Sequence, residues 1–464
     1  MAGLFDMLRS ASQAMDAQRY GLDVTGQNIA NVNTPGYTRR RPMLSEIPPP
    51  DKFTSGSGVR IDGVTVERDV FLERQLRAEL PAEQREGALA GALRRVELAI
   101  GGSGALLNDR ITEFFDSFSR LADAPLSSVA RQEVVLRGES LSESFNELSD
   151  RLVTAQRDAD SQVRATVDDI NALATRLASI NEALVSIDAS SPQALHLRDE
   201  GRTTVEELSQ LTGAEVVERP DGGYDVSIGN GRALVIGSSI RELSVSSQPV
   251  TGLADIVADD GTVLTDLVQS GKLQGLLHAR DELIPSYQDS VDDLAYTFVE
   301  EVNTLHTSGY DQNGTAGQVF FQALGSSSGA AANVALNAAL SATGGEALVA
   351  ASGDASAVGD NAVARALSNL RDGRVMAGNT ATFSDAWSRI VYRVGRDLSA
   401  AEDQQATRRE LVRQVQALRD GVSGVSMDEE AANLMRFQRA YEANARYFTV
   451  VDQTLATLLQ MAGV

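Results

Sequence analysis

The sequence predicts a mainly α-helical protein with a β insertion, built as several domains: paired terminal helices that form a coiled coil, an elongated helical bundle and a small β-rich outer domain. Apolar residues recur at alternating spacings of three and four at both ends of the chain, which is typical of helical seams. Long internal stretches have helical periodicity, and one stretch alternates apolar and polar residues between turn signals. A chain of 464 residues is longer than a single core normally supports, so we expect two or more domains.

The N-terminal helix carries the first seam. Its positions are Leu4, Leu8, Ala11, Met15, Gln18, Leu22, Thr25, Ile29 and Val32. Pro35 disfavours helical geometry at Thr34, and Pro35-Gly36 fits the two central positions of a type II turn. We therefore expect the helix to end near Asn31 to Asn33, in a turn made by Asn31, Asn33, Thr34, Pro35, Gly36 and Tyr37.

The C-terminal helix carries the second seam. Its positions are Leu434, Phe437, Tyr441, Asn444, Phe448, Val451, Leu455, Leu458 and Ala462. Ser426 is a suitable N-cap, Asp428 to Glu430 place negative charge in the first turn, and Glu429 lies three residues after the cap. The helix is predicted to begin near Met427.

The seams predict that residues 1–35 and 425–464 form a terminal assembly domain. Ordering two helices of this length costs conformational entropy that one seam of apolar side chains offsets only marginally. An intramolecular helical hairpin is one interpretation, and helices that fold when they assemble with neighbouring subunits are the other.

Four internal helices are predicted to build the elongated bundle, from residues 36–210 with 271–320 and 359–424. They are Ser127–Ile187, which would be about 90 Å long, Lys272–Thr307, Phe383–Leu418 and Pro81–Ile100. Pro285 should kink or restart the second of them.

The outer domain is predicted at residues 211–270, because Gly213 to Val250 alternates apolar and polar residues. Asp221-Gly222-Gly223 and Asn230-Gly231 are good hairpin turns. Residues 321–358, which are rich in Ala, Gly and Ser, have too few large apolar residues for their own core, so we expect a loop or loosely packed segment.

Composition argues against several functions. The net charge of -23 disfavours binding to nucleic acids or anionic membranes, and the absence of cysteine excludes disulfides and thiolate metal sites. The first twenty residues contain Asp6, Arg9 and Asp16, so they do not form the apolar core of a signal peptide, and no stretch is long enough to span a membrane.

Residues that could carry chemistry are scattered. His196, His278 and His306 lie far apart, and no catalytic motif stands out, so we expect no enzyme activity, no cofactor and no metal. Gly101 to Gly104 is interpreted as a turn, and Asp311 to Gly317 as a turn after a helix. Arg39 to Arg41 could contact an acidic partner surface or be a solvated run.

Four stretches carry a family resemblance. "QNIANVNTPGYTRR" at Gln27–Arg40 resembles the N-terminal signature of bacterial flagellar rod, hook and hook-associated proteins, in the form found in the hook-associated protein 1 (FlgK) family. Ser270–Gly314, Gly359–Leu370 and Ser423–Leu459 are similar to later segments of that family, in the same order. Residues 213–270 and 322–358 carry no such similarity.

The resemblance implies a structural subunit at the junction between hook and filament, assembled into a ring through its terminal helices. It also implies export through the flagellar type III channel without a cleaved signal peptide, and an extracellular place in the flagellum. Implied partners are further copies of the chain, the hook protein, the second junction protein and an export chaperone. The alternatives are a hook or distal rod subunit, a cytoplasmic coiled-coil scaffold, or an unrecognised hydrolase.

Overall fold

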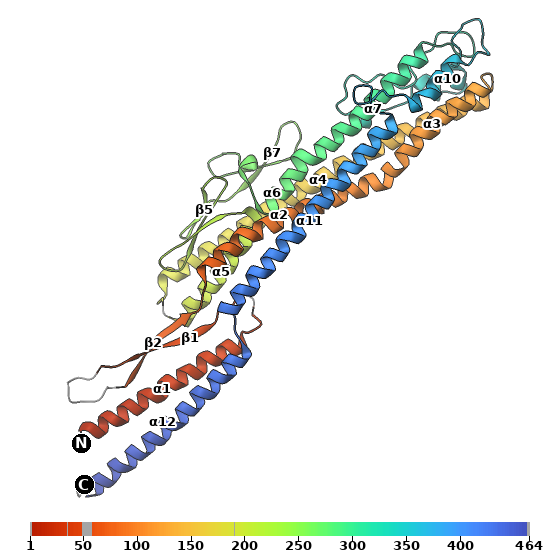
Figure 1. Ribbon diagram of the computed structural model, residues 1–464. Coiled ribbons are helices and arrows are strands. Elements are labelled where there is room, and N and C mark those ends of the chain that lie inside the picture. Colours follow the sequence, from red (N-terminus) through yellow and green to blue (C-terminus); the bar gives the residue numbers. More distant parts are fainter. Residues whose placement is uncertain (1, 35, 49–57, 190, 462–464) are drawn as a thin grey trace.

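The computed structural model describes residues 2–34, 36–48, 58–189 and 191–461, so predictions that fall on Pro35 and Ala462 lie outside the described residues. The molecule is long and narrow: a pair of terminal helices lies at one end, a helical rod forms the rest, and the β-rich part lies on the flank of the rod (Figure 1). The predicted fold class is confirmed. Within the described part of the chain, no helix is both long and apolar enough to cross a membrane.

The terminal helices are α1 (Ala2–Ala30) and α12 (Met427–Met461). They pack side by side in opposite directions, with both chain ends at the far tip of the molecule (Figure 1). The predicted end of the first helix and the predicted start of the last are confirmed. Gly21 allows a close approach, because a Cβ there would lie 2.6 Å from the Phe437 ring.

The rod is built mainly from α2 (Val70–Ala99), α3 (Ala105–Asp123), α4 (Ser128–Ser186), α5 (Pro192–Thr212), α6 (Gly271–His278), α7 (Ile284–Thr307) and α11 (Phe383–Ser423). Helix α4 begins at the N-cap Ser127 and is 59 residues long, as its uninterrupted periodicity predicts. Pro285 occupies the first turn of α7, so the predicted helical restart is confirmed; the π-helical turn η3 (Ala279–Leu283) joins α6 to α7.

Two boundaries differ from the expectation. Helix α2 begins at Val70, after Asp69 caps its first turn, and Pro81 lies inside it rather than at its start. The stretch Gly101 to Gly104 is not a sharp turn, because it belongs to the π-helical turn η1 (Ile100–Gly104), which leads into α3. The prediction treated Pro81 and these glycines as residues that end a helix, but the packing of α2 against α11 and α6 keeps the segment helical.

The main core fills the distal half of the rod. Phe114, Phe298 and Phe383 are buried there, with the Phe298 ring edge-to-face against Phe114 at 5.4 Å and against Phe383 at 5.2 Å. Residues 321–358, expected to be loosely packed, instead contain the short helices α8 (Ala330–Asn333), α9 (Ala338–Ser341) and η4 (Gly345–Leu348) and bury Phe321, Ala331, Val334, Leu340 and Ala350 in this core. Small side chains fill narrow spaces between helices, so a segment poor in large apolar residues can still be tightly packed. The short helices α10 (Ala362–Asn369) and η5 (Leu370–Asp372) follow.

The β insertion has two small antiparallel sheets. The first contains β3 (Glu215–Glu218), β4 (Tyr224–Ile228), β5 (Arg232–Ile236) and β6 (Ser239–Ile240); the second pairs β7 (Ser244–Ser247) with β8 (Ala254–Val257), and η2 (Thr265–Leu267) follows. Both predicted hairpin turns connect strands, and Asn230 and Gly231 have φ of 63° and 85°. The fully buried Arg280 fixes the insertion to the rod, because it donates to Asp160 and to the Ala254 carbonyl, each at 2.7 Å.

A two-stranded ribbon was not predicted. It pairs β1 (Arg40–Glu46) with β2 (Val59–Val66), within a range that was expected to be helical. The ribbon starts beside Asn28 at the end of α1 and runs back along that helix, so that a Cβ at Gly58 would lie 3.4 Å from the Ser10 Cα. The β1 sequence RRPMLSE has only a short alternation, which is why the pattern gave no clear signal.

His306 is fully buried in the main core and is neutral. Its Nε2 accepts from the Ala350 N–H at 2.9 Å, and its Nδ1 donates to the Gln318 carbonyl. Burial lowers the pKa of His306 to about 4. As the pH falls from about 6.5 to about 4, the unfolded chain therefore binds a proton that the native core excludes, and the free energy of unfolding falls.

We expect His306→Gln to remove this pH dependence, because glutamine can accept from Ala350 and donate to Gln318 without titrating. The wild type should lose about 3 kcal/mol more stability than the variant between pH 7.5 and pH 4. Urea unfolding of the full chain at several pH values measures this difference. His278→Gln is the control, and an unchanged pH slope in His306→Gln would contradict the prediction.

Candidate functional site

The turn after α1 is closed by local hydrogen bonds. The Tyr37 N–H donates to the Thr34 carbonyl at 3.2 Å, and Gly36 has a left-handed φ of 78°, as a type II turn requires. Thr34 Oγ1 donates to Asn31 Oδ1 at 3.1 Å, whereas Asn33 is exposed. The turn directs the chain out of the helical pair and into β1.

Asn28 is the buried centre of the contacts around this turn. Its Nδ2 donates to the Arg40 carbonyl at 2.9 Å and to Glu430 Oε2 at 3.1 Å. Its Oδ1 accepts from the Arg40 N–H at 3.1 Å and from the Tyr37 hydroxyl at 2.9 Å. The side-chain amide thereby joins the end of α1, the turn, β1 and α12, with all of its hydrogen-bonding capacity used.

Arg39 joins the two terminal helices through charge. Its Nε donates to Glu430 Oε1 at 2.8 Å, and its Nη1 lies 2.5 Å from Glu429 Oε2. Its backbone N–H donates to the Ser423 carbonyl at the end of α11. Burial opposes the charged guanidinium, but the hydrogen bonds to both glutamates outweigh it and raise the pKa of Arg39 above its ordinary value.

Arg40 and Arg202 connect the same region to α5. Arg40 donates to Asp199 Oδ2 at 3.2 Å, and its guanidinium lies 4.9 Å from the centre of the Tyr37 ring. Arg202 donates to the Gly36 carbonyl and, at 2.7 Å, to Thr38 Oγ1. Asp199 completes the set by accepting from Thr38 at 3.0 Å.

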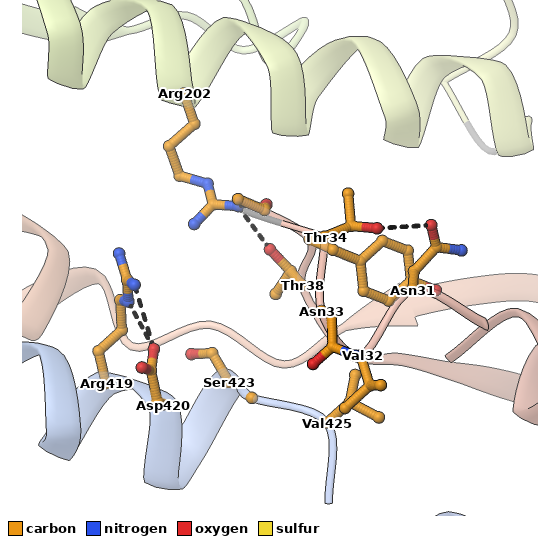
Figure 2. Close-up of a pocket in the computed structure, with 13 residues that line it drawn as sticks. Asn31, Val32, Asn33, Thr34, Thr38, Arg202, Arg419, Asp420, Ser423 and Val425 are labelled. Carbon is orange, nitrogen blue, oxygen red and sulfur yellow. Dashed lines mark hydrogen bonds and ion pairs between the residues drawn. The ribbon is translucent and has the colours of Figure 1, made fainter. Parts of the chain in front are cut away.

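We call this network the clamp. It consists of Asn28, Tyr37, Thr38, Arg39, Arg40, Asp199, Arg202, Glu429 and Glu430. Beside it, a hollow of about 330 Å³ lies between the turn, Arg202 and the end of α11 (Figure 2). The clamp fixes the terminal pair to the rod where the chain passes from one to the other.

Both sequence interpretations of Arg39 to Arg41 were wrong for the first two residues. Arg39 and Arg40 are only 6% and 8% exposed and pair within the chain, so they are neither solvated nor free to contact a partner. Arg41 is exposed and pairs with Glu67. The acceptors Asp199 and Glu430 are far from the arginines in sequence, so only the folded chain shows the pairing. The nearest sequence signal was the acidic first turn of α12.

The predicted seam positions on α1 are all at least partly covered. Ala11 and Thr25 are buried, and the others are half-buried: Leu4, Leu8, Met15, Gln18, Leu22, Ile29 and Val32. The fully buried positions Ala17, Gly21 and Val24 were missed, because small residues gave little weight to the pattern.

On α12 the predicted seam is divided. Phe437 and Val451 are buried, and Leu434, Asn444, Phe448 and Leu455 are half-buried. Tyr441 and Leu458, placed in the seam by spacing, are exposed. A further exposed stripe, which we call the outer stripe, was missed; it contains Tyr447, Val450, Leu458 and Met461. One helix thus presents one apolar surface to α1 and another to solvent.

The site has the chemistry of a structural joint. Its charged groups are matched in ion pairs and hydrogen bonds, and among the described residues no three His, Asp or Glu side chains are grouped to hold a metal ion. This arrangement can fix helices relative to one another and present apolar surface.

Comparisons with known proteins identify similar chains. The model described as "Flagellar hook-associated protein FlgK helical domain" matches residues 93–321, "Flagella basal body rod protein" matches 8–38, and "Flagellar basal body rod FlgEFG protein C-terminal" matches 421–461. Flagellar hook-associated protein 1 of Escherichia coli (strain K12) is 25% identical over 98% of this chain and 99% of its own. Its namesake in Bacillus subtilis (strain 168) is 25% identical over 100% of this chain and 99% of its own. The solved flagellar hook junction protein FlgK from Burkholderia pseudomallei has a similar fold, with a TM-score of 0.66 and 17% identity over 75% of this chain and all of that one.

We predict that Arg39→Met or Glu430→Met alone loosens the terminal pair, because each leaves the opposite charge buried without its main partner. The cost should be about 3 to 5 kcal/mol, and the double variant should recover part of it. Hydrogen exchange of α1 and α12 amides, together with thermal unfolding, measures the effect. Arg60→Met is the control, since Arg60 is exposed and pairs with nearby Asp62. A double variant no better than the worse single variant would refute the coupling.

Gly36→Ala should also weaken the clamp. A side chain is strained at this φ, and its Cβ would lie 2.4 Å from Thr203 Oγ1. The expected cost is about 1 to 3 kcal/mol, read from the melting of the full chain. Gly26→Ala in the interior of α1 is the matched control: it has open space and should be neutral or stabilising by about 0.5 to 1 kcal/mol. Equal effects at the two positions would count against the assigned turn.

Proposed function

Because the chain belongs to the FlgK family of flagellar hook-associated proteins, we propose that it forms the junction between the hook and the filament by polymerising through its terminal helices. In this proposal the chain is a structural subunit of the bacterial flagellum and not an enzyme. The main observation that supports this proposal is the outer stripe on α12.

The outer stripe repeats at helical spacing. The exposed residues Tyr447, Val450, Leu458 and Met461 lie on one face of the helix, and Thr454 lies on the same face between Val450 and Leu458. Val450 is 60% exposed although the adjacent Val451 is buried against the pair. A helix whose apolar residues extend from the α1 contact to an adjacent exposed flank can pack against α1 and, on that flank, against another subunit.

The clamp supports the same proposal. It fixes the start of α12 to the end of α1, so both terminal helices project together from one end of the rod (Figure 1). Assembly through this pair would place the rod and the β insertion outside the contacts between terminal helices. We propose the corresponding division into domains: 1–35 with 425–464, a helical bundle of 36–210, 271–320 and 359–424, and an outer domain of 211–270, with 321–358 as a segment that packs in the core of the bundle.

The alternative of a hook or distal rod subunit is less well supported. The matches at the two ends of the chain are to descriptions of basal body rod proteins, whereas the match over 93–321 is to the FlgK helical domain. That range includes α4, the long helix that hook and rod subunits are expected to lack. A cytoplasmic coiled-coil scaffold would share the terminal helices but would not account for the match to the helical domain.

We further propose that the chain is exported to the flagellum through the type III channel without a cleaved signal peptide. Its expected partners are further copies of itself in a ring, the hook protein on one side and the second junction protein on the other. A flagellar chaperone is expected to accompany it before export. These partners follow from the family and agree with the marginal apolar seam of the isolated terminal pair.

We expect Leu458→Asp to prevent filament attachment while leaving the monomer folded, because Leu458 is 42% exposed within one chain. Losing one buried leucine at each repeated contact should reduce filament-bearing hooks by about tenfold or more. Electron microscopy of cells that lack the native gene and carry the variant counts hooks with filaments, and circular dichroism measures monomer folding. The control is Gln453→Asp, at an exposed polar position of the same helix. Normal filaments with Leu458→Asp would defeat the proposal.

A further inference from the structure

The lower half of α11 has an apolar stripe that the described part of the chain leaves exposed. Leu411, Leu418 and Val422 are exposed, and we call them the basal stripe. Their neighbours Val412 and Val415 are buried against Leu76 and Leu80 of α2, so the stripe lies beside the α2 contact on the flank of the helix. Leu418 is 60% exposed, and together with Leu411 and Val422 it makes a stripe rather than a single exposed residue.

The upper half of the same flank is covered by α7. Arg393 donates at 2.8 Å to the Ser286 carbonyl, and the Tyr287 hydroxyl donates at 2.8 Å to Asp397. Leu411, Leu418 and Val422 follow Arg393 along α11 by nearly whole numbers of helical turns. They therefore lie on the same side of the helix as Arg393, which is the side that α7 covers in the upper half. Because α7 begins at Ile284 and runs away toward the distal end, the basal stripe is left open.

The β1–β2 ribbon lies along α1 but still leaves apolar residues exposed. It is a sheet of two strands, so both of its outer edges lack a neighbouring strand in the described part of the chain. Leu44 and Ile61 are cross-strand partners, the strand register shifts between Met43 and Leu44, and Met43, Leu44 and Ile61 are all exposed. Two-stranded ribbons are marginally stable without further packing, so this one gains from a partner that covers its apolar residues.

The ribbon does not reach the basal stripe of its own chain. Its root is tied to the clamp, where Arg39 donates to the Ser423 carbonyl, and its far end lies beside Ser10 of α1. The basal stripe lies on the opposite side of the clamp, along α11 (Figure 1). The two surfaces therefore point to opposite ends of the molecule, and a contact between them requires two chains.

We propose that the ribbon of one copy packs against the basal stripe of the next copy; this contact rests on the proposed polymerisation. The charges around both surfaces are already matched: Arg41 pairs with Glu67, Arg60 with Asp62, Glu410 with Arg413 and Asp420 with Arg419. Such local neutralisation permits apolar contact between chains whose net charge is -23.

The contact is heterologous, because different surfaces of the two copies meet, and it has a geometric consequence. The ribbon extends about 26 Å below its own clamp, whereas the stripe lies above the clamp of its neighbour. Contacting copies are therefore displaced along their long axis by a distance of that order.

Disulfide cross-linking tests the contact cleanly, because the chain has no cysteine of its own. Two differently tagged chains are expressed in the same cells, one with Leu418→Cys and the other with Met43→Cys or Ile61→Cys, which lie on different strands of the ribbon. After mild oxidation of isolated flagella, we expect one ribbon variant to give a reducible dimer with both tags, at least about tenfold above the control pair. The control replaces Leu418→Cys with Val129→Cys, which is exposed near the distal end of the rod.

Assembly itself is read separately, by electron microscopy of the same flagella. Filament-bearing flagella in which neither ribbon cysteine variant gives a cross-link would overturn the ribbon contact and leave the proposed function standing.

As a second measure, Leu418→Asp should lower the number of filament-bearing hooks several-fold without shifting the melting of the monomer. Ala417→Asp, at an exposed neighbouring position, should have little effect. Equal effects of the two aspartates would also overturn the proposal.

Discussion

The arrangement of the whole molecule depends on one buried ion pair, between the Arg39 guanidinium and the Glu430 carboxylate. Placing these charges in the interior is costly, and the cost is offset because Glu429 also accepts from the Arg39 guanidinium and Asn28 donates to the Glu430 carboxylate. The pair connects a strand that leaves the first helix to the first turn of the last helix. Without it, the terminal helices would be held to the rod only by the remaining clamp contacts, such as Arg40 with Asp199 and Arg202 with Thr38, and by two short stretches of chain.

This joint separates two kinds of stability. The rod has its own cores, in which aromatic rings and small side chains are fully buried. The terminal pair has one seam and leaves a second apolar stripe exposed on α12, so packing within one chain satisfies only part of its surface. A subunit of this kind can stay folded as a monomer and still gain stability when its ends meet those of other copies.

The basal stripe and the ribbon are further apolar surfaces, and they lie outside the terminal helices. Each leaves apolar residues exposed in the part of the chain that the structure describes, and the clamp fixes the two on opposite sides of one joint. A rigid joint would make the offset between neighbouring copies a property of the folded chain, since the positions of both surfaces are set before assembly begins.

The sequence by itself determined the helices, the hairpin turns and the seam spacing, because these depend on neighbouring residues: caps, prolines, glycines and periodicity. Ser127, Pro285, Gly36 and Asn230 each mark a boundary that the structure contains. Only the tertiary structure decided that Arg39 pairs with Glu430, 391 positions away, that Pro81 stays inside a helix, and that Leu458 faces outward. The physical reason is that a side chain's partner is chosen by packing between distant segments, whereas local preference fixes only the conformation of the segment that carries it.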